Sequence, residues 1–220
     1  MLGNFLNQVK EKINVLNVKG DPMPFYLSGV KMLEAGNYNA AFQQFKQAAI
    51  LNPQQPFTFF HLGTACFNLN RFSEAKSFYK KFLRLYSDLD SASTLDIDSK
   101  LDINWVHANV YNNLGVISNR EEDFIKAIGY YQRAIRAQRD CIEAINNLGD
   151  TYFKMGLYDE GIKAYYQALR IEPDNAEAHF GLGLVYVDLK EKEEVLRIVE
   201  ILKNLNNELA DKLLTRVYQP

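Results

Sequence analysis

Two pairs of adjacent asparagines are the residues of this chain best suited to binding another polypeptide. Asn112–Asn113 and Asn146–Asn147 lie 34 residues apart in a chain of 220 residues. An asparagine side chain donates through its amide nitrogen and accepts through its oxygen, so it can pair with both polar groups of a peptide backbone. Such a residue can hold an extended chain largely independently of the sequence of that chain. The pairs therefore indicate a peptide-binding surface.

The sequence offers no comparable arrangement for catalysis or metal binding. Its three histidines, His61, His107 and His179, are widely separated, and no nucleophile elbow, phosphate-binding loop or HExxH motif is present. The aspartates within residues 96–102 lack the glycine turn and terminal glutamate of a calcium loop. We therefore expect no enzyme, no metal and no cofactor.

Composition argues against several other classes of protein. A net charge of −2 and a pI near 6.0 give no electrostatic reason to expect a nucleic-acid partner. Cys66 and Cys141 have no metal-ligand spacing and are expected to be free thiols, so we predict an intracellular, cytoplasmic protein. The sequence contains no run of 18 apolar residues, so we expect no membrane span. Charged residues at 10–12 interrupt the apolar core that a secretion leader needs.

The asparagine pairs belong to a repeated pattern that must position them. Five glycines are separated by 34, 52, 34 and 34 residues: Gly29, Gly63, Gly115, Gly149 and Gly183. In four units a small residue follows the glycine by twelve positions and an aromatic follows by sixteen: Phe45, Tyr79, Tyr131 and Tyr165. This spacing predicts two short helices per unit. The glycine and the small residue let the helices approach closely, and the aromatic fills the gap between them.

With these positions recurring in register, the chain resembles a tetratricopeptide repeat (TPR) protein over about residues 22–207. The resemblance implies an all-α fold, a right-handed superhelix (solenoid) of helix-turn-helix repeats. We expect repeats at 22–55, 56–89, 108–141, 142–175 and 176–207. Because one helical pair cannot bury its apolar face alone, we expect them to fold as a single cooperative domain.

The two ends of the chain are expected to cover the open ends of the repeat array. Residues 1–21 contain an apolar stripe that predicts an amphipathic capping helix: Leu2, Phe5, Leu6, Val9, Ile13 and Leu16. Self-association, binding to a partner, or contact with a membrane surface through residues 2–16 are the alternatives. The last is the weakest, since the polar face is not rich in Lys and Arg. Residues 208–220 predict a C-terminal capping helix.

The insertion at 90–107 is the one segment outside the repeat pattern between the two ends. Ser99 with Asp102 resembles a helix N-terminal capping box, so we expect the next helix to begin near residue 100. Trp105, the only tryptophan, is then part of a helix that overhangs its neighbours. It could serve as a lid or a docking anchor, or it could pack onto the second repeat.

The resemblance also implies where a partner binds. In the TPR family the first helices of successive repeats line a concave groove, through their second, fifth, sixth, ninth and twelfth residues. Asn113 and Asn147 match the position that binds ligand backbone in several relatives. On this pattern the candidate peptide-binding residues are Tyr26, Phe57, Phe60, His61, Thr64, Asn109, Asn112, Asn113, Val116, Asn146, Asn147 and Asp150.

We therefore expect a non-catalytic adaptor or co-chaperone-like module that binds a partner peptide or helix in this groove. The chaperone-type carboxylate clamp of the family is excluded, because its basic positions are not basic here and Glu143, Asp150 and Glu177 would repel a carboxylate. The alternative is a self-assembling head-to-tail scaffold, a homo-oligomer built through the N-terminal helix or the insertion. Removing residues 1–21 distinguishes the two, since only a scaffold should lose its oligomers.

Overall fold

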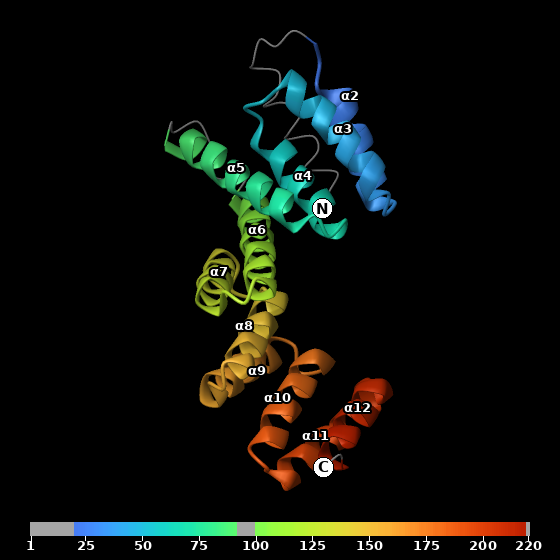
Figure 1. Ribbon diagram of the computed structural model, residues 1–220, viewed down its shortest axis with the longest axis vertical. Helices are drawn as coiled ribbons and strands as arrows, with labels where there is room; N and C mark the ends of the chain where they lie inside the picture. The colour runs from blue at the N-terminus through green and yellow to red at the C-terminus, as the bar shows by residue number, and fades with distance from the viewer. Residues whose placement is uncertain (1–19, 92–99, 219–220) are drawn as a thin grey trace. The chain divides into compact units, whose positions relative to one another are not determined.

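The computed structural model describes residues 20–91 and 100–218, and within them it contains eleven α-helices and no strand (Figure 1). The predicted all-α class is confirmed. The predicted N-terminal stripe at 2–16 and the capping Ser99 lie outside the described residues. The helices are α2 (Met23–Glu34), α3 (Tyr38–Leu51), α4 (Pro56–Asn68), α5 (Phe72–Ser91), α6 (Lys100–Arg120), α7 (Phe124–Ala137), α8 (Ile142–Lys154), α9 (Tyr158–Ile171), α10 (Ala176–Asp188), α11 (Lys192–Leu205) and α12 (Asn207–Tyr218).

The helices come in pairs, one pair for each predicted repeat. The first helix of a pair carries the repeat glycine, and the second carries the aromatic residue or its equivalent. Within the pairs, α2 packs on α3, α4 on α5, α8 on α9 and α10 on α11. The helix α6 begins at Lys100, as the helix-start signal predicts, and its 21 residues exceed the 12 or 13 of the other first helices.

The chain divides into two compact units, 1–110 and 111–220, and the boundary falls inside α6. The described part of unit 1 comprises α2 to α5 and the beginning of α6. The described part of unit 2 comprises the end of α6 and α7 to α12. That the five repeats unfold in one cooperative transition stays a prediction.

In each repeat the glycine forms a notch that receives a large side chain. A Cβ added to Gly29, Gly63, Gly115 or Gly149 would lie only 2.5 to 2.8 Å from the ring of the aromatic residue 16 positions later. In the fifth repeat Leu213 of α12 occupies the corresponding place beside Gly183. The close approach of the two helices therefore depends on the missing side chain, as the sequence pattern predicts.

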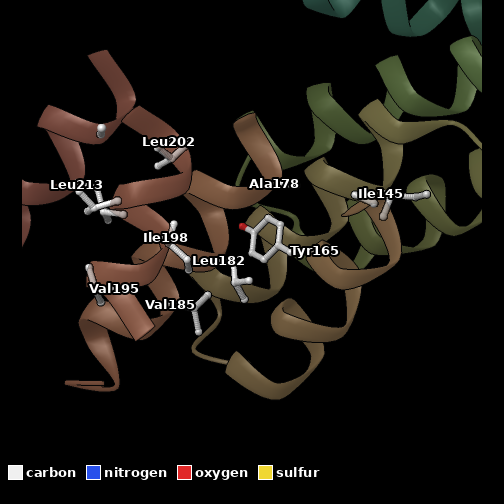
Figure 2. Packing of buried hydrophobic residues seen from close by; sticks show 12 residues of the cluster. Ile145, Tyr165, Ala178, Leu182, Val185, Val195, Ile198, Leu202 and Leu213 are labelled. Carbon is white, nitrogen blue, oxygen red and sulfur yellow. The ribbon is translucent and has the colours of Figure 1, made fainter. Parts of the chain in front are cut away.

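The core of the fourth and fifth repeats is continuous within unit 2. Tyr165 of α9, Leu182 of α10, Ile198 of α11 and Leu213 of α12 belong to one buried cluster (Figure 2). Helix α12 contributes its buried Ala210 and Leu213, and its exposed face carries charged side chains. An amphipathic helix of this kind covers apolar surface of the last repeat and presents a polar face to water.

The turn between the two helices of a repeat always contains one residue in the left-handed region. These residues have φ between +57° and +72° and recur at the repeat period: Gly36, Asn70, Glu122, Gly156 and Lys190. The next residue then donates its backbone N–H to a carbonyl five positions before it, as Glu191 does to Tyr186 at 2.9 Å. Glu122 and Lys190 carry a side chain where glycine is the favoured residue.

Replacing Lys190 by glycine is expected to raise the free energy of unfolding by about 1 kcal/mol. The left-handed conformation costs an L-residue about 1–2 kcal/mol, partly offset by the greater freedom of glycine in the unfolded chain. Gly156→Lys is the matched control at the same turn position, where nothing lies within 4 Å of an added Cβ, and it should destabilise by a similar amount. Urea denaturation followed by circular dichroism measures both. A destabilised Lys190→Gly variant would contradict this explanation.

Candidate peptide-binding surface

The first helices of the repeats carry the predicted lining residues, and in unit 2 an amide pair joins two of these helices. The Nδ2 of Asn147 on α8 donates to the Oδ1 of Asn112 on α6 at 3.0 Å. Both side chains are half-buried. Within residues 20–91 and 100–218, Asn112 Nδ2 and Asn147 Oδ1 have no hydrogen-bond partner. The pair therefore offers one donor and one acceptor to a ligand.

A second set of polar contacts, centred on the fully buried Thr151, joins the same two helices. The Nδ2 of Asn119 donates to Thr151 Oγ1 at 2.6 Å, and the Nζ of Lys154 donates to Asn119 Oδ1 at 2.9 Å. Thr151 in turn donates to the backbone carbonyl of Asn147 at 2.7 Å. These bonds fix α8 against α6. Lys154 is exposed and is not among the predicted site residues, although its spacing of seven residues from Asn147 places it on the same helix face. Thr151 is fully buried and supports the surface from below.

Asn146 does not belong to this surface. Its side chain is only 6 % exposed, and its Nδ2 donates to Asn175 Oδ1 at 3.0 Å. That same oxygen of Asn175 accepts the backbone N–H of Ala178 and so caps the start of α10. Asn146 thus ties α8 to the turn before α10, a structural role. We correct its predicted place in the contact set.

Asp150 lies one turn beyond Asn147 on α8 and is exposed. The hydroxyl of the buried Tyr165 donates to its Oδ1 at 2.6 Å. Surrounding protein raises the pKa of this carboxyl group by desolvation, while the Tyr165 bond and the charge of Lys154 act in the opposite direction.

The other two predicted lining residues of unit 2, Asn113 and Val116 of α6, are half-buried.

In unit 1 three of the predicted lining residues are packing residues. Tyr26, Phe60 and His61 are at most 8 % exposed. The His61 ring stacks on Phe45 with centroids 5.0 Å apart, and it also contacts the rings of Tyr26 and Phe60. Neither ring nitrogen of His61 has a hydrogen-bond partner among the described residues, and burial lowers its pKa to about 3. We correct the predicted role of these three residues, since their side chains lie below the surface.

The remaining predicted residues of unit 1 are partly accessible. Phe57 packs on Phe82 with centroids 6.0 Å apart, and Thr64 donates to the carbonyl of Phe60 at 3.0 Å. The amide of Asn109 donates to the carbonyl of Trp105 in its own helix at 2.9 Å, so part of its hydrogen-bonding capacity is used locally. The structure thus leaves Phe57 and Thr64 as the accessible predicted residues on α4.

Trp105 packs onto the second repeat and keeps part of its side chain exposed, while a role as a lid or a docking anchor stays a prediction. Its ring meets the edge of Phe60 with centroids 6.3 Å apart, so it packs onto the second repeat, yet 49 % of the residue is exposed. Nearby, the His107 ring contacts the rings of Phe82 and Tyr86, with centroids 5.5 and 4.8 Å away. Unit 1 therefore presents an aromatic surface in which Trp105 and Phe57 are the accessible members.

Comparison with protein families settles the identity of the repeats. A family described as tetratricopeptide repeat matches residues 58–89 and 108–141, and a family described as TPR repeat matches residues 149–190. These segments contain the helix pairs and glycine notches described above. The chain is a tetratricopeptide repeat protein. The TPR fold is generally a non-catalytic platform for protein–protein interaction, and TPR proteins bind protein partners.

Solved structures and curated sequences resemble this TPR protein over most of its length. The TPR protein YrrB, described as having an unusual peptide-binding site, superposes with a TM-score of 0.66 at 18 % identity, over 89 % of this chain and 92 % of YrrB. MamA superposes with a TM-score of 0.63 at 24 % identity, over 90 % of this chain and 96 % of MamA. Identities this low show the fold alone.

Among curated proteins, human protein O-mannosyl-transferase TMTC3 is 29 % identical over 174 residues. The match covers 79 % of this chain but only 18 % of that relative, so this TPR protein spans less than a fifth of it. The match therefore does not transfer the transferase activity that the relative's name states.

The described residues lack two further features. Within residues 20–91 and 100–218, no helix is long and apolar enough to cross a membrane. The same part of the chain contains no group of three histidine, cysteine, aspartate or glutamate side chains placed to hold a metal ion.

Proposed function

We propose that this TPR protein is an adaptor that binds an extended segment of a partner protein across the first helices of its third and fourth repeats. The observation that carries the proposal is the amide pair Asn112–Asn147. One hydrogen bond between their amide groups joins the two side chains, and an unused donor and an unused acceptor remain on opposite helices. These two groups are complementary to the carbonyl and the N–H of a peptide backbone.

The surroundings of the pair support a preformed site. The bonds from Asn119 to Thr151 and from Lys154 to Asn119 hold α6 and α8 together before any ligand arrives. A ligand then does not have to order these side chains, which lowers the entropic cost of binding. Backbone hydrogen bonds supply affinity in such a mode, while side-chain contacts supply specificity.

The aromatic surface of unit 1 is a second, separate feature that suits a protein partner. Trp105 and Phe57 are accessible aromatic residues on a packed aromatic base. Aromatic side chains that are only partly covered are typical anchor points of protein interfaces. We propose an apolar segment of the partner as their ligand. The buried free thiols Cys66 and Cys141 support the proposal of a reducing, cytoplasmic setting.

Replacing both Asn112 and Asn147 by alanine is expected to weaken peptide binding about 10- to 100-fold, because each lost hydrogen bond is worth about 0.5–1.5 kcal/mol. Random 12-residue peptides displayed on phage would be selected on the wild-type protein. The affinities of synthetic copies would then be measured by fluorescence anisotropy. Asn204→Ala is the matched control, since Asn204 is an exposed asparagine on α11 that bonds only to a carbonyl of its own helix. It should bind within twofold of wild type.

Loss of helicity would mimic loss of the site, so the double variant must first show an unchanged circular dichroism spectrum. Selected peptides that bind the folded double variant as tightly as wild type would overturn the proposed site. Failure to select any peptide on the wild-type protein would count against a peptide-binding function altogether.

A further inference from the structure

The surface formed by α6 and α8 contains one carboxylate whose orientation is fixed from below. Asp150 lies on the same face of α8 as Asn147, three residues further on. The Tyr165 hydroxyl donates to its Oδ1 at 2.6 Å, a short hydrogen bond to a charged acceptor. Oδ2 has no hydrogen-bond partner in the part of the chain that the structure describes.

Tyr165 cannot easily move away from Asp150, because glycines on two helices enclose its ring. A Cβ added to Gly149 of α8 would lie 2.7 Å from its Cε1 atom, and a Cβ added to Gly181 of α10 would lie 2.4 Å from the same atom. The ring is 1 % exposed and belongs to the buried cluster of unit 2 (Figure 2). Its hydroxyl is therefore a fixed donor, and the Asp150 side chain that accepts from it is fixed as well.

Neighbouring repeats do not reproduce this arrangement. At the position of Asp150 the second repeat has Thr64 and the third has Val116. The matching Tyr79 hydroxyl donates to the Thr64 hydroxyl at 3.5 Å, so at this position the buried tyrosine meets a neutral side chain. The fourth repeat is thus the one of these three in which a buried phenol orients a carboxylate.

Asp150 makes no ion pair within the described residues, although the charge of Lys154 lowers the pKa of its carboxyl group. None of the ion pairs found there includes Asp150, and Lys154, one turn further on, donates its Nζ to Asn119 instead. Desolvation by the surrounding protein raises the pKa of the carboxyl group, while the Tyr165 bond and the charge of Lys154 act against that rise. A cation brought by a ligand would pair with Oδ2, the oxygen that Tyr165 leaves unused.

We propose that Asp150, held in place by Tyr165, selects a lysine or arginine side chain of the bound peptide. This inference rests on the proposed function and names the chemistry of its ligand. The amide pair Asn112–Asn147 binds the peptide backbone, and the carboxylate one turn away receives a basic side chain through a charge-assisted hydrogen bond. Tyr165 is a positioning residue, because it acts only through Asp150.

The test uses the same random 12-residue peptides, selected in parallel on wild-type protein and on Asp150→Asn. Wild-type selection should enrich Lys or Arg at one fixed place in the peptide, and selection on Asp150→Asn should not. A synthetic wild-type-selected peptide should bind Asp150→Asn about 10-fold more weakly. Replacing its basic residue by glutamine should weaken binding to wild type by the same factor and leave binding to Asp150→Asn unchanged. Asp174→Asn, at an exposed acidic residue before α10, is the control and should retain the preference.

Tyr165→Phe removes the hydroxyl and keeps the ring, so it tests the positioning role in a protein whose core remains filled. It should reduce the basic preference about threefold with an unchanged circular dichroism spectrum. Equal basic enrichment on wild type and Asp150→Asn would overturn the inference and leave the backbone-binding proposal intact. An unchanged preference in Tyr165→Phe would overturn the positioning role. Peptides that bind independently of Asn112 and Asn147 would instead overturn the proposed function itself.

Discussion

Replacing Gly115 by alanine is expected to lower the free energy of unfolding by about 2 kcal/mol. The added Cβ would lie 2.5, 2.7 and 2.9 Å from three ring carbons of Tyr131, which is itself buried. Overpacking a filled core costs about 1–3 kcal/mol. Alanine is the better helix former by about 1 kcal/mol, so helix propensity alone predicts the opposite sign. Urea denaturation followed by circular dichroism would measure the change.

Gly129 provides a matched control in the same repeat. It lies within α7, and a Cβ added there would meet nothing within 4 Å. Gly129→Ala should therefore stabilise the protein by about 0.5–1 kcal/mol. In the double variant Gly115→Ala with Tyr131→Leu, the alanine should cost less than it does beside tyrosine, because the ring that it strikes is gone. Two alanine substitutions that both stabilise would contradict the glycine notch.

The second large effect is expected from His61→Phe, and it depends on pH. His61 is buried among Tyr26, Phe45 and Phe60, and its folded-state pKa of about 3 lies below the ordinary value of 6.5. The folded state therefore excludes the proton that the unfolded chain binds. The contribution of neutral His61 is complete above pH 6.5 and declines as pH falls toward 3, by about 1.4 kcal/mol per pH unit.

Phenylalanine binds no proton and removes the two unpaired ring nitrogens. The advantage of His61→Phe over wild type should therefore grow by about 2–3 kcal/mol between pH 7 and pH 4.5. At pH 7 the variant should be at least as stable as wild type, since buried polar groups without partners are costly. Urea denaturation at the two pH values measures the difference. Phe60→Leu is the control, since Phe60 is a buried neighbour that does not titrate. It should change the free energy of unfolding equally at both pH values. A pH-independent effect of His61→Phe would contradict the buried neutral histidine.

The fold follows from the sequence because its strongest constraints are periodic. The glycines at 34-residue intervals predict the close helix pairs, and a Cβ at these positions would collide with the predicted aromatic rings. The start of α6 at Lys100 was likewise signalled by capping chemistry. The sequence does not predict the left-handed turns at Glu122 and Lys190, since neither residue type favours that conformation. They become visible only when all five repeats are aligned on the turn.

The site was predicted less completely, because repeat register fixes the face of a helix but not the depth of a side chain. Asn146 and Asn147 are adjacent and chemically identical. One is buried and bonds to the turn at Asn175, whereas the other pairs with Asn112 on the neighbouring helix. His61 fell on a predicted groove position, yet the large rings of Tyr26 and Phe45 enclose it. Such outcomes depend on contacts between helices, which the sequence of a single helix does not encode.

The Asp150–Tyr165 contact illustrates the same limit. The two residues are 15 positions apart and lie on different helices of one repeat. Taken alone, Asp150 is an ordinary acidic residue at a predicted groove position, and Tyr165 is an ordinary aromatic residue of the core. The glycine notches at Gly149 and Gly181, which admit the ring between α8 and α10, bring the hydroxyl to the carboxylate. The electrostatic character of the surface therefore derives from packing as well as from the residues exposed on it.

The most direct test of the central claim is to observe the side-chain amides of Asn112 and Asn147 while a peptide binds. Their nitrogen–proton resonances would be assigned with the single alanine variants. They would then be followed by NMR during titration with a peptide selected on wild-type protein. The binding surface proposed here predicts that both amide resonances shift in proportion to the bound fraction, while that of Asn204 on α11 does not. Saturation of the protein with peptide while the Asn112 and Asn147 amides stay unchanged would contradict it.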